Sequence, residues 1–262
     1  MGSITKLFHE KIGPVAKEHS FFRQGDLYYR LVGDVLQSFQ FKKYSFWCPD
    51  YQTCTVEFEI TPLAIFPFLF SIDILRQNLR HFTQDWTEWQ YKPLSPEDAE
   101  RCVREIVARM REDLFPFFEQ ASNCEKALPL LLQLEYSSNE MRKKMLRKRG
   151  SSDEAGALAG IGLQDDHLLW MALKSRDYNS AIAFCRVQVG GLFTGLQYER
   201  KVAAASDEET PRYLQEKQAY FDKMKELWLY IEERNQVLLD KIVAENETAN
   251  RAYLQTIMKK EK

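Results

Sequence analysis

Alternating apolar and polar positions predict a small antiparallel sheet in the first third of the chain. In residues 53–61, TCTVEFEIT, apolar residues alternate with threonine and glutamate, which predicts a strand with one buried and one solvent-facing side. Residues 27–32 and 35–41 are two further strand candidates, and Gly33 supplies the positive φ that a tight hairpin between them needs. A fourth strand is expected within residues 82–91, which are rich in aromatic residues and threonine.

Helical periodicity appears on both sides of these strands. Residues 4–16 repeat apolar side chains every three or four positions, and we expect Pro14 to bend or end the regular helix. A second helix should begin at Pro96, because Ser95 can accept hydrogen bonds from its first backbone N–H groups and proline is favoured at the first helical position. We expect that helix to stop at Pro116.

The second half of the chain has a helical pattern throughout. Residues 167–189 read as a pair of helices about a turn at 177–179, and Gly190-Gly191 is expected to separate this pair from the next helical segment. Thr210 can cap a helix that no later glycine or proline interrupts, so one long terminal helix is predicted. Its apolar residues between 221 and 242 form a seam that packs on the preceding helices or joins two copies of the chain.

Together these patterns predict an α+β fold. We expect an N-terminal helix, an antiparallel sheet of about four strands covered by helices, and then an all-helical C-terminal region with a long terminal helix. The predicted organisation is an α+β domain over 1–138, a connector over 139–162 and a helical region over 163–262. The connector is first basic and then rich in glycine, alanine and serine.

Composition and charge argue against several classes of protein. The 36 basic and 38 acidic residues leave a formal net charge of −2, which does not favour an extended nucleic-acid interface. The five cysteines form no CxxC pair, so we expect reduced thiols, no metal site and no cofactor. The first residues lack the apolar core of a signal peptide, and no apolar run is long enough to cross a bilayer. We therefore expect a cytoplasmic protein without membrane contact.

Several short motifs in the first half also resemble a known family. The matching positions are Phe21 or Phe22, Tyr29-Arg30, Asp34-Val35, Gln40-Phe41-Lys42 and the closing PFFE of residues 116–119. With the leading helix and the TVEFEI strand, residues of about 1–135 resemble the bacterial domain-of-unknown-function family 4304. The sequence departs from the family at two places. The glycine expected directly after Phe22 stands at position 25 instead, and the third strand ends in Thr61-Pro62 where the family has a glycine. The resemblance implies an α+β fold and carries no functional residue.

Aromatic and polar side chains on the predicted hairpin are the first candidate site. They either form a platform on which a base or a peptide stacks, or are the core side of the sheet. We expect most rings to face inward. The candidates for contacting a ligand or partner are Tyr28, Tyr29, Arg30, Gln40, Trp47 and Trp86.

A run of basic residues at the start of the connector is the second candidate. It could hold phosphate groups, or it is a solvated helix end whose charges lie near the last carbonyl groups. Its members are Arg142, Lys143, Lys144, Arg147, Lys148 and Arg149.

No catalytic motif is recognisable in the sequence, so we expect a binding protein and leave enzymatic activity undecided. The favoured function is a non-catalytic interaction protein of the bacterial cytoplasm with an unidentified protein partner, of the kind that an immunity factor represents. One alternative is a small-ligand protein or enzyme with a pocket between sheet and helices. The other is nucleic-acid binding through residues 142–149, which the charge balance does not favour.

Overall fold

The computed structural model describes most of the chain as two compact units. The described residues are 4–44, 52–67, 77–82, 89–92, 95–134, 165–205 and 212–259. Unit 1 comprises Met1–Thr61 and Phe70–Ile161, and unit 2 comprises Pro62–Leu69 and Gly162–Lys262. The connector predicted over 139–162 lies outside the described residues.

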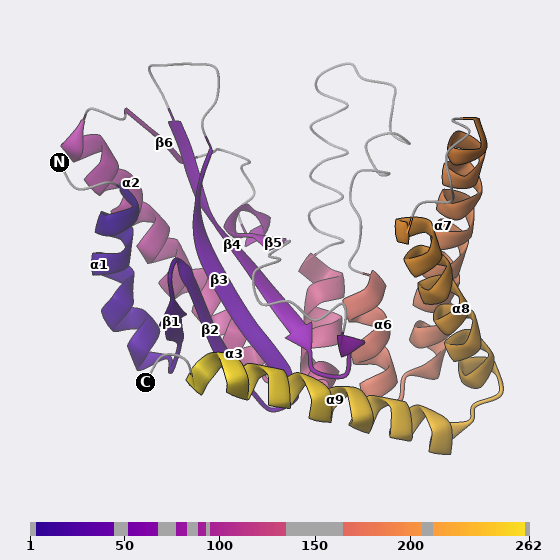
Figure 1. The fold of residues 1–262 in the computed structure, drawn as a ribbon. Helices are drawn as coiled ribbons and strands as arrows, with labels where there is room; N and C mark the ends of the chain where they lie inside the picture. Colours follow the sequence, from indigo (N-terminus) through magenta and orange to yellow (C-terminus); the bar gives the residue numbers. More distant parts are fainter. Residues whose placement is uncertain are drawn as a thin grey trace. The chain divides into compact units, whose positions relative to one another are not determined.

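Unit 1 is built on an antiparallel sheet of six strands (Figure 1). The strands are β1 (Phe22–Gln24), β2 (Leu27–Val32), β3 (Val35–Tyr44), β4 (Gln52–Pro62), β5 (Gln77–Asn78) and β6 (Trp89–Tyr91). They follow the order β1-β2-β3-β4-β5, and β6 also pairs with β4. The predicted hairpin is present between β2 and β3, with Gly33 at a φ of +60° in its turn. The predicted α+β class is confirmed, with a sheet larger than the four strands expected.

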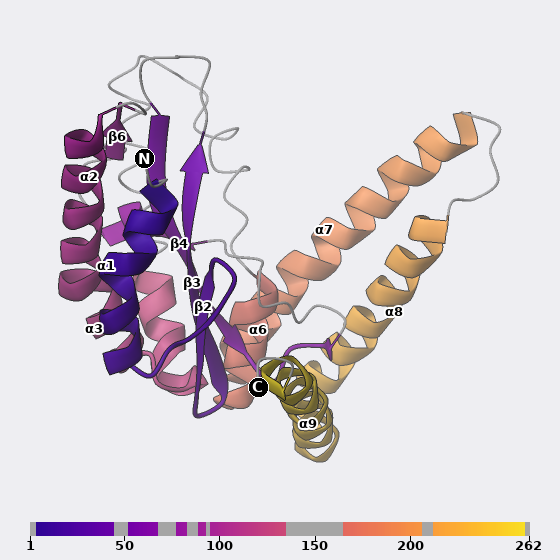
Figure 2. The same cartoon turned by 60° about the vertical axis from the view of Figure 1, so that its left-hand side comes forward.

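Three helices cover one face of this sheet (Figure 2). They are α1 (Ile4–Glu18), which continues past Pro14, α2 (Pro96–Arg109) and α3 (Phe115–Gln120). Phe8 of α1 stacks on Phe41 with ring centroids 4.6 Å apart, and Phe118 of α3 lies edge-on to Phe58 at 5.9 Å. These buried rings form the core of unit 1, because aromatic side chains remove large apolar areas from water.

The polar side of β4 differs from its prediction. Thr55, Glu59 and Thr61 alternate with the apolar residues as expected, yet all three are buried. The prediction of a solvent-facing side is therefore wrong for this strand. Alternation in sequence reports which residues share a face of a sheet, but it does not report whether that face is covered.

The helix after Ser95 begins as predicted but ends later. Ser95 accepts a hydrogen bond from the backbone N–H of Asp98 at 3.2 Å, and Pro96 occupies the first turn. After α2 the chain forms a π-helical turn, η3 (Met110–Leu114), and then continues as α3 through Pro116. The expected stop at Pro116 is wrong, because proline is tolerated in the first turn of a new helical segment, where its missing N–H costs no hydrogen bond. Residues 124–134 form a further helix.

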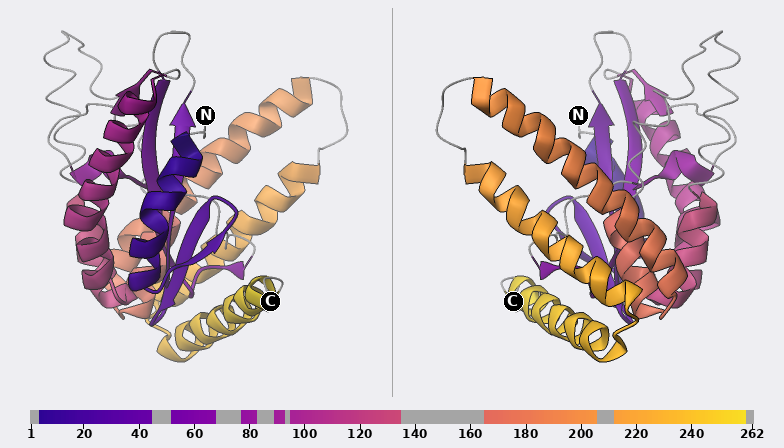
Figure 3. Two further views of the ribbon diagram at one scale, coloured as in Figure 1. Left: turned by 90° about the vertical axis from the view of Figure 1, so that its left-hand side faces the viewer. Right: turned by 90° about the vertical axis from the view of Figure 1, so that its right-hand side faces the viewer.

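Unit 2 contains four helices among its described residues. They are α6 (Asp165–Lys174), α7 (Tyr178–Ala205), α8 (Arg212–Glu232) and α9 (Gln236–Lys259). Figure 3 shows α7 and α8 side by side, and α6 and α9 pack near one end of this pair. The predicted helical C-terminal region that ends in a long helix is confirmed.

Two predicted boundaries in unit 2 are wrong. Helix α7 runs unbroken through Gly190-Gly191. In contrast, the helix expected from Thr210 to the end is interrupted between Glu232 and Gln236, so the 221–242 seam is divided between α8 and α9. Its use as a contact between copies stays a prediction.

The break between α8 and α9 is made by a Schellman motif without glycine. Arg234 has a φ of +50°. Its backbone N–H donates to the carbonyl of Ile231 at 3.1 Å, and the backbone N–H of Asn235 donates to the carbonyl of Tyr230 at 3.0 Å. Glycine is the usual residue at this left-handed position, because a Cβ is disfavoured there. The same motif ends α1 at Ser20 and α6 at Arg176.

Replacing Arg234 by glycine should therefore stabilise unit 2. We expect Arg234→Gly to raise the free energy of unfolding by about 0.5–1 kcal/mol, because glycine adopts the observed φ without steric cost. Thermal unfolding measures the change. Glu232→Gly, two residues earlier in the helix, is the matched control and should lower stability by about 1 kcal/mol. A destabilised Arg234→Gly variant would contradict this account of the break.

Residues that come after β4 are held within unit 2 by two asparagines of α9. The side-chain amide of Asn250 donates to the carbonyls of Leu63 and Ile65, and that of Asn246 donates to Ala64, all at 2.8 Å. The ring of Phe66 lies edge-on to Trp170 of α6 at 4.7 Å. A buried loop must satisfy its carbonyl groups, and these amides do so where no strand partner is available.

Candidate functional site

The structure places Tyr28 in the core of unit 1. Its side chain is 2% exposed and stacks on Phe39 with ring centroids 4.7 Å apart. Its hydroxyl lies 3.1 Å from Nδ1 of His9, whose Nε2 lies 2.9 Å from Asp26. Burial raises the pKa of the Tyr28 hydroxyl above its ordinary value. This ring is part of the packing between sheet and α1, not an accessible platform.

Arg30 is buried beside Tyr28 on the same face of the sheet. Its Nε donates to Gln37 Oε1 at 2.7 Å, and its Nη1 donates to the carbonyl of His19 and to Glu119 Oε1, both at 2.8 Å. The guanidinium lies 4.7 Å from the centre of the Phe21 ring, which adds a cation–π attraction. Its Nη2 has no hydrogen-bond partner within the described part of the chain. The contacts of Arg30 join β2, β3 and α3.

The carboxylate of Glu119 provides the countercharge for Arg30. It is also 3.3 Å from Nδ1 of His19, whose ring stacks on Phe115 at 4.3 Å. Partial burial acts to raise the pKa of Glu119, but the hydrogen bonds from Arg30 and His19 hold it below the ordinary value. A carboxylate that pairs with Arg30 and accepts a hydrogen bond from a second partner stabilises the fold and is poorly suited to accept a substrate proton.

The remaining candidates from the sequence do not join this cluster. Tyr29 and Gln40 belong to the opposite face of the β2–β3 pair, because Tyr29 is paired with Ser38 and Gln40 with Leu27. A single pocket on one face of the sheet therefore cannot use Arg30 and Tyr29 together. Trp47, Trp86 and the basic run of residues 142–149 lie outside the described residues, so their proposed roles stay predictions.

Two cysteines meet between β4 and α2. Sγ of Cys54 is 3.6 Å from Sγ of Cys102, and both side chains are buried. The hydrogen bond with Cys102 and burial raise the pKa of the Cys54 thiol far above its ordinary value. Both thiols are enclosed in the core, where buried cysteines behave as small apolar side chains, so this pair acts as core packing. Over the described ranges, three metal-ligating side chains never gather closely enough to hold an ion.

Helix α7 presents a surface that was not among the candidate sites named from the sequence. On the side opposite its buried residues Cys185, Val189 and Leu196, it exposes a continuous uncharged stripe. We call this stripe the α7 face; its members are Ala183, Val187, Gly191, Thr194, Tyr198 and Val202.

The α7 face results directly from helix geometry. Its members are four, four, three, four and four positions apart, so they stay on one side of the helix over about 28 Å. Val187, Tyr198 and Val202 are 60%, 69% and 53% exposed, and Lys201 is a charged residue at the edge. Gly191 and Thr194 at the centre of the face have small side chains, so the backbone of another helix can approach α7 closely there.

Sequence reasoning missed this face because it ended a helix at Gly190-Gly191. Once α7 is continuous, residues on the two sides of the glycines share one face. The indication was present as an uncharged residue at every third or fourth position from 183 to 202. Glycines inside a helix cost stability but do not end it when the helix packs against neighbours.

Comparison with known proteins adds no assignment. No family model, curated protein or solved structure matches the chain. The resemblance to family 4304 therefore stays a prediction. None of the described helices combines the length and the apolar content needed to span a bilayer.

Proposed function

We propose that this chain is a non-catalytic interaction protein that binds a protein partner through the α7 face. The observation that carries the proposal is the exposure of Val187, Tyr198 and Val202 along one uncharged side of a 28-residue helix. Single exposed apolar side chains are ordinary on protein surfaces, whereas an aligned set is typical of a binding surface.

The chemistry of the face suggests the kind of partner. A charged partner surface would lose its hydration here without gaining an opposite charge, so an apolar helix or strand edge is favoured. Tyr198 supplies a large aromatic ring with a polar hydroxyl, the type of side chain that often dominates binding energy. The small side chains of Gly191 and Thr194 at the centre of the face allow a helix of the partner to pack closely against α7.

A cross-linking experiment tests this function. A photoreactive phenylalanine analogue at position 198 should cross-link a stoichiometric partner in native lysate, and the same analogue at Val237, which is 80% exposed on α9, should not. Tyr198→Glu should weaken binding of that partner at least tenfold, because loss of an interface anchor costs about 2 kcal/mol or more. Val237→Glu is the matched control and should leave binding unchanged.

Two results would reject the proposal. One is equal cross-linking from positions 198 and 237, and the other is full binding by Tyr198→Glu. A product of twice the mass of the chain would identify the partner as a second copy. The proposed bacterial setting rests on the resemblance to family 4304, and the proposed cytoplasmic setting rests on cysteine usage and the lack of a signal-peptide pattern. The immunity-like role needs the partner's identity.

A further inference from the structure

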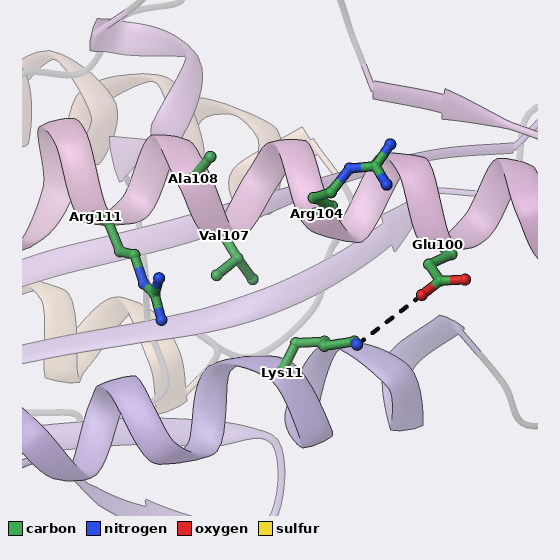
Figure 4. A pocket seen from close by; sticks show the side chains of 6 residues that line it. All are labelled: Lys11, Glu100, Arg104, Val107, Ala108 and Arg111. Atoms are coloured by element: carbon green, nitrogen blue, oxygen red, sulfur yellow. Dashed lines mark ion pairs between the residues drawn. The ribbon is translucent and has the colours of Figure 1, made fainter.

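A small groove lies between α1 and α2 in unit 1. It has a volume of about 300 Å³ and is shown in Figure 4. The lining residues are Lys11, Glu100, Arg104, Val107, Ala108 and Arg111. Three of these side chains are cationic and one is anionic, so the groove has an excess of two positive charges.

The excess charge is specific to this side of the helix. Two other arginines of α2 are neutralised by acidic residues one turn away. Arg101 contacts Asp98 at 2.7 Å and Glu105 at 3.3 Å, and Arg109 contacts Asp113 at 3.3 Å and Glu112 at 3.7 Å. Arg101 and Arg109 are therefore paired with acids at helical spacing, whereas Arg104 makes no ion pair among the described residues although Glu100 stands four residues before it.

The two arginines that line the groove lack such partners. Neither Arg104 nor Arg111 makes an ion pair in the part of the chain that the structure describes. Arg111 has Val107 four residues before it and Phe115 four residues after it, so no acid stands at that spacing. It also lies in the π-helical turn η3, a geometry that is rare in helices and frequent at functional sites.

The side chains are arranged to enclose an anion from two helices. In Figure 4, Val107 of α2 and Arg111 of η3 point toward α1, Lys11 extends from α1 toward Glu100, and the guanidinium of Arg104 points away from α1. The Lys11–Glu100 pair is 3.9 Å long, and both side chains are more than half exposed. Such an exposed pair is weak, so Lys11 can turn to a ligand at little cost. Val107 offers an apolar floor.

We propose that this groove binds a small organic anion with two separated anionic groups, phosphate or carboxylate. Arg111 and Lys11 hold one group, and Arg104, about 10 Å further along the helix, holds the other. Guanidinium groups suit both chemistries because they donate two parallel hydrogen bonds. The volume is at the lower end for small-molecule sites, and three cations are few for a nucleic-acid interface, which usually contacts more phosphates.

Titration calorimetry of the full chain tests the site, with tripolyphosphate and citrate as probes at constant ionic strength. Arg104→Gln combined with Arg111→Gln should weaken probe binding about tenfold, which corresponds to about 1.4 kcal/mol. Arg101→Gln combined with Arg109→Gln removes the same charge from the same helix. This control pair should change binding less than twofold. Thermal unfolding of both variants confirms that they remain folded.

The outcomes separate clearly. Tighter binding of tripolyphosphate points to a phosphorylated ligand, tighter binding of citrate points to a polycarboxylate, and either supports the site when the groove variant alone is impaired. Equal loss in both arginine pairs would show a general charge effect and would overturn the proposal. Lack of binding of both probes at millimolar concentration would also overturn it. These results do not depend on the α7 face.

Discussion

Replacing Gln37 by leucine should be among the most damaging single changes in unit 1. Gln37 is fully buried; its Nε2 donates to the carbonyl of Phe118 at 2.6 Å and of Ala121 at 2.9 Å, while its Oε1 accepts from Arg30. Leucine has a similar size but leaves two carbonyl groups and a guanidinium N–H unsatisfied. We expect Gln37→Leu to lower the free energy of unfolding by about 3–5 kcal/mol.

A chain with two units need not unfold in one step, so a single unfolding curve does not isolate the change in unit 1. Hydrogen exchange measured by mass spectrometry is therefore the suitable measurement. Exchange should accelerate in β3 and α3, which Gln37 connects. The matched control is Gln120→Leu, the same substitution at an exposed position of α3, with an expected change within about 0.5 kcal/mol. A Gln37→Leu variant as stable as this control would show that the three hydrogen bonds contribute little.

Replacing Asn250 by alanine should have the corresponding effect in unit 2. Asn250 is 1% exposed, and both hydrogens of its amide are used by the carbonyls of Leu63 and Ile65. Alanine removes both donors and leaves a small cavity. We expect Asn250→Ala to lower the free energy of unfolding of unit 2 by about 2–4 kcal/mol.

The same exchange measurement locates the change. Amides of residues 63–65 and of the facing part of α9 should lose protection. Thr248→Ala is the control in the same helix, because the Thr248 hydroxyl donates only to the carbonyl of Ala244 within α9 and is exposed. Unchanged protection at residues 63–65 in Asn250→Ala would mean that the loop is held by Phe66 and not by the asparagine.

Local features of the sequence predicted the elements of unit 1 well. Period-two alternation located β4, glycine at a positive φ located the β2–β3 turn, and Ser95 with Pro96 located the start of α2. Each of these depends on backbone conformation or on a side chain that bonds its own segment. Such interactions act over a few residues, so the sequence alone contains them.

Helix ends were predicted less well, and the reason is conformational. Prediction relied on glycine and proline, but Ser20, Arg176 and Arg234 adopt a positive φ without being glycine. Their cost is offset by the two hydrogen bonds of each Schellman motif. The opposite error occurred at Gly190-Gly191, where packing of α7 against α6 and α8 keeps the helix intact.

The candidate site also shows the difference between features that are local in the sequence and features that depend on packing. The sequence correctly indicated that aromatic residues of the hairpin include core residues, but it named Tyr28 and Arg30 as candidates for contacting a ligand or partner, and both are buried. It could not show that Arg30 is enclosed by Gln37, Glu119 and Phe21, which lie up to 89 positions away in the chain. Nor could it show that Arg104 and Arg111 line a groove beside α1 and make no ion pair with the described acidic residues.

By itself, the sequence determined the α+β class, the hairpin, the helical C-terminal half and the start of α2, because hydrophobic period and capping chemistry are local properties. Only the tertiary structure decided that the polar side of β4 is buried, that residues 62–67 join unit 2, and which helix faces remain exposed. Burial depends on which surfaces meet, and that is set by packing between segments far apart in the chain.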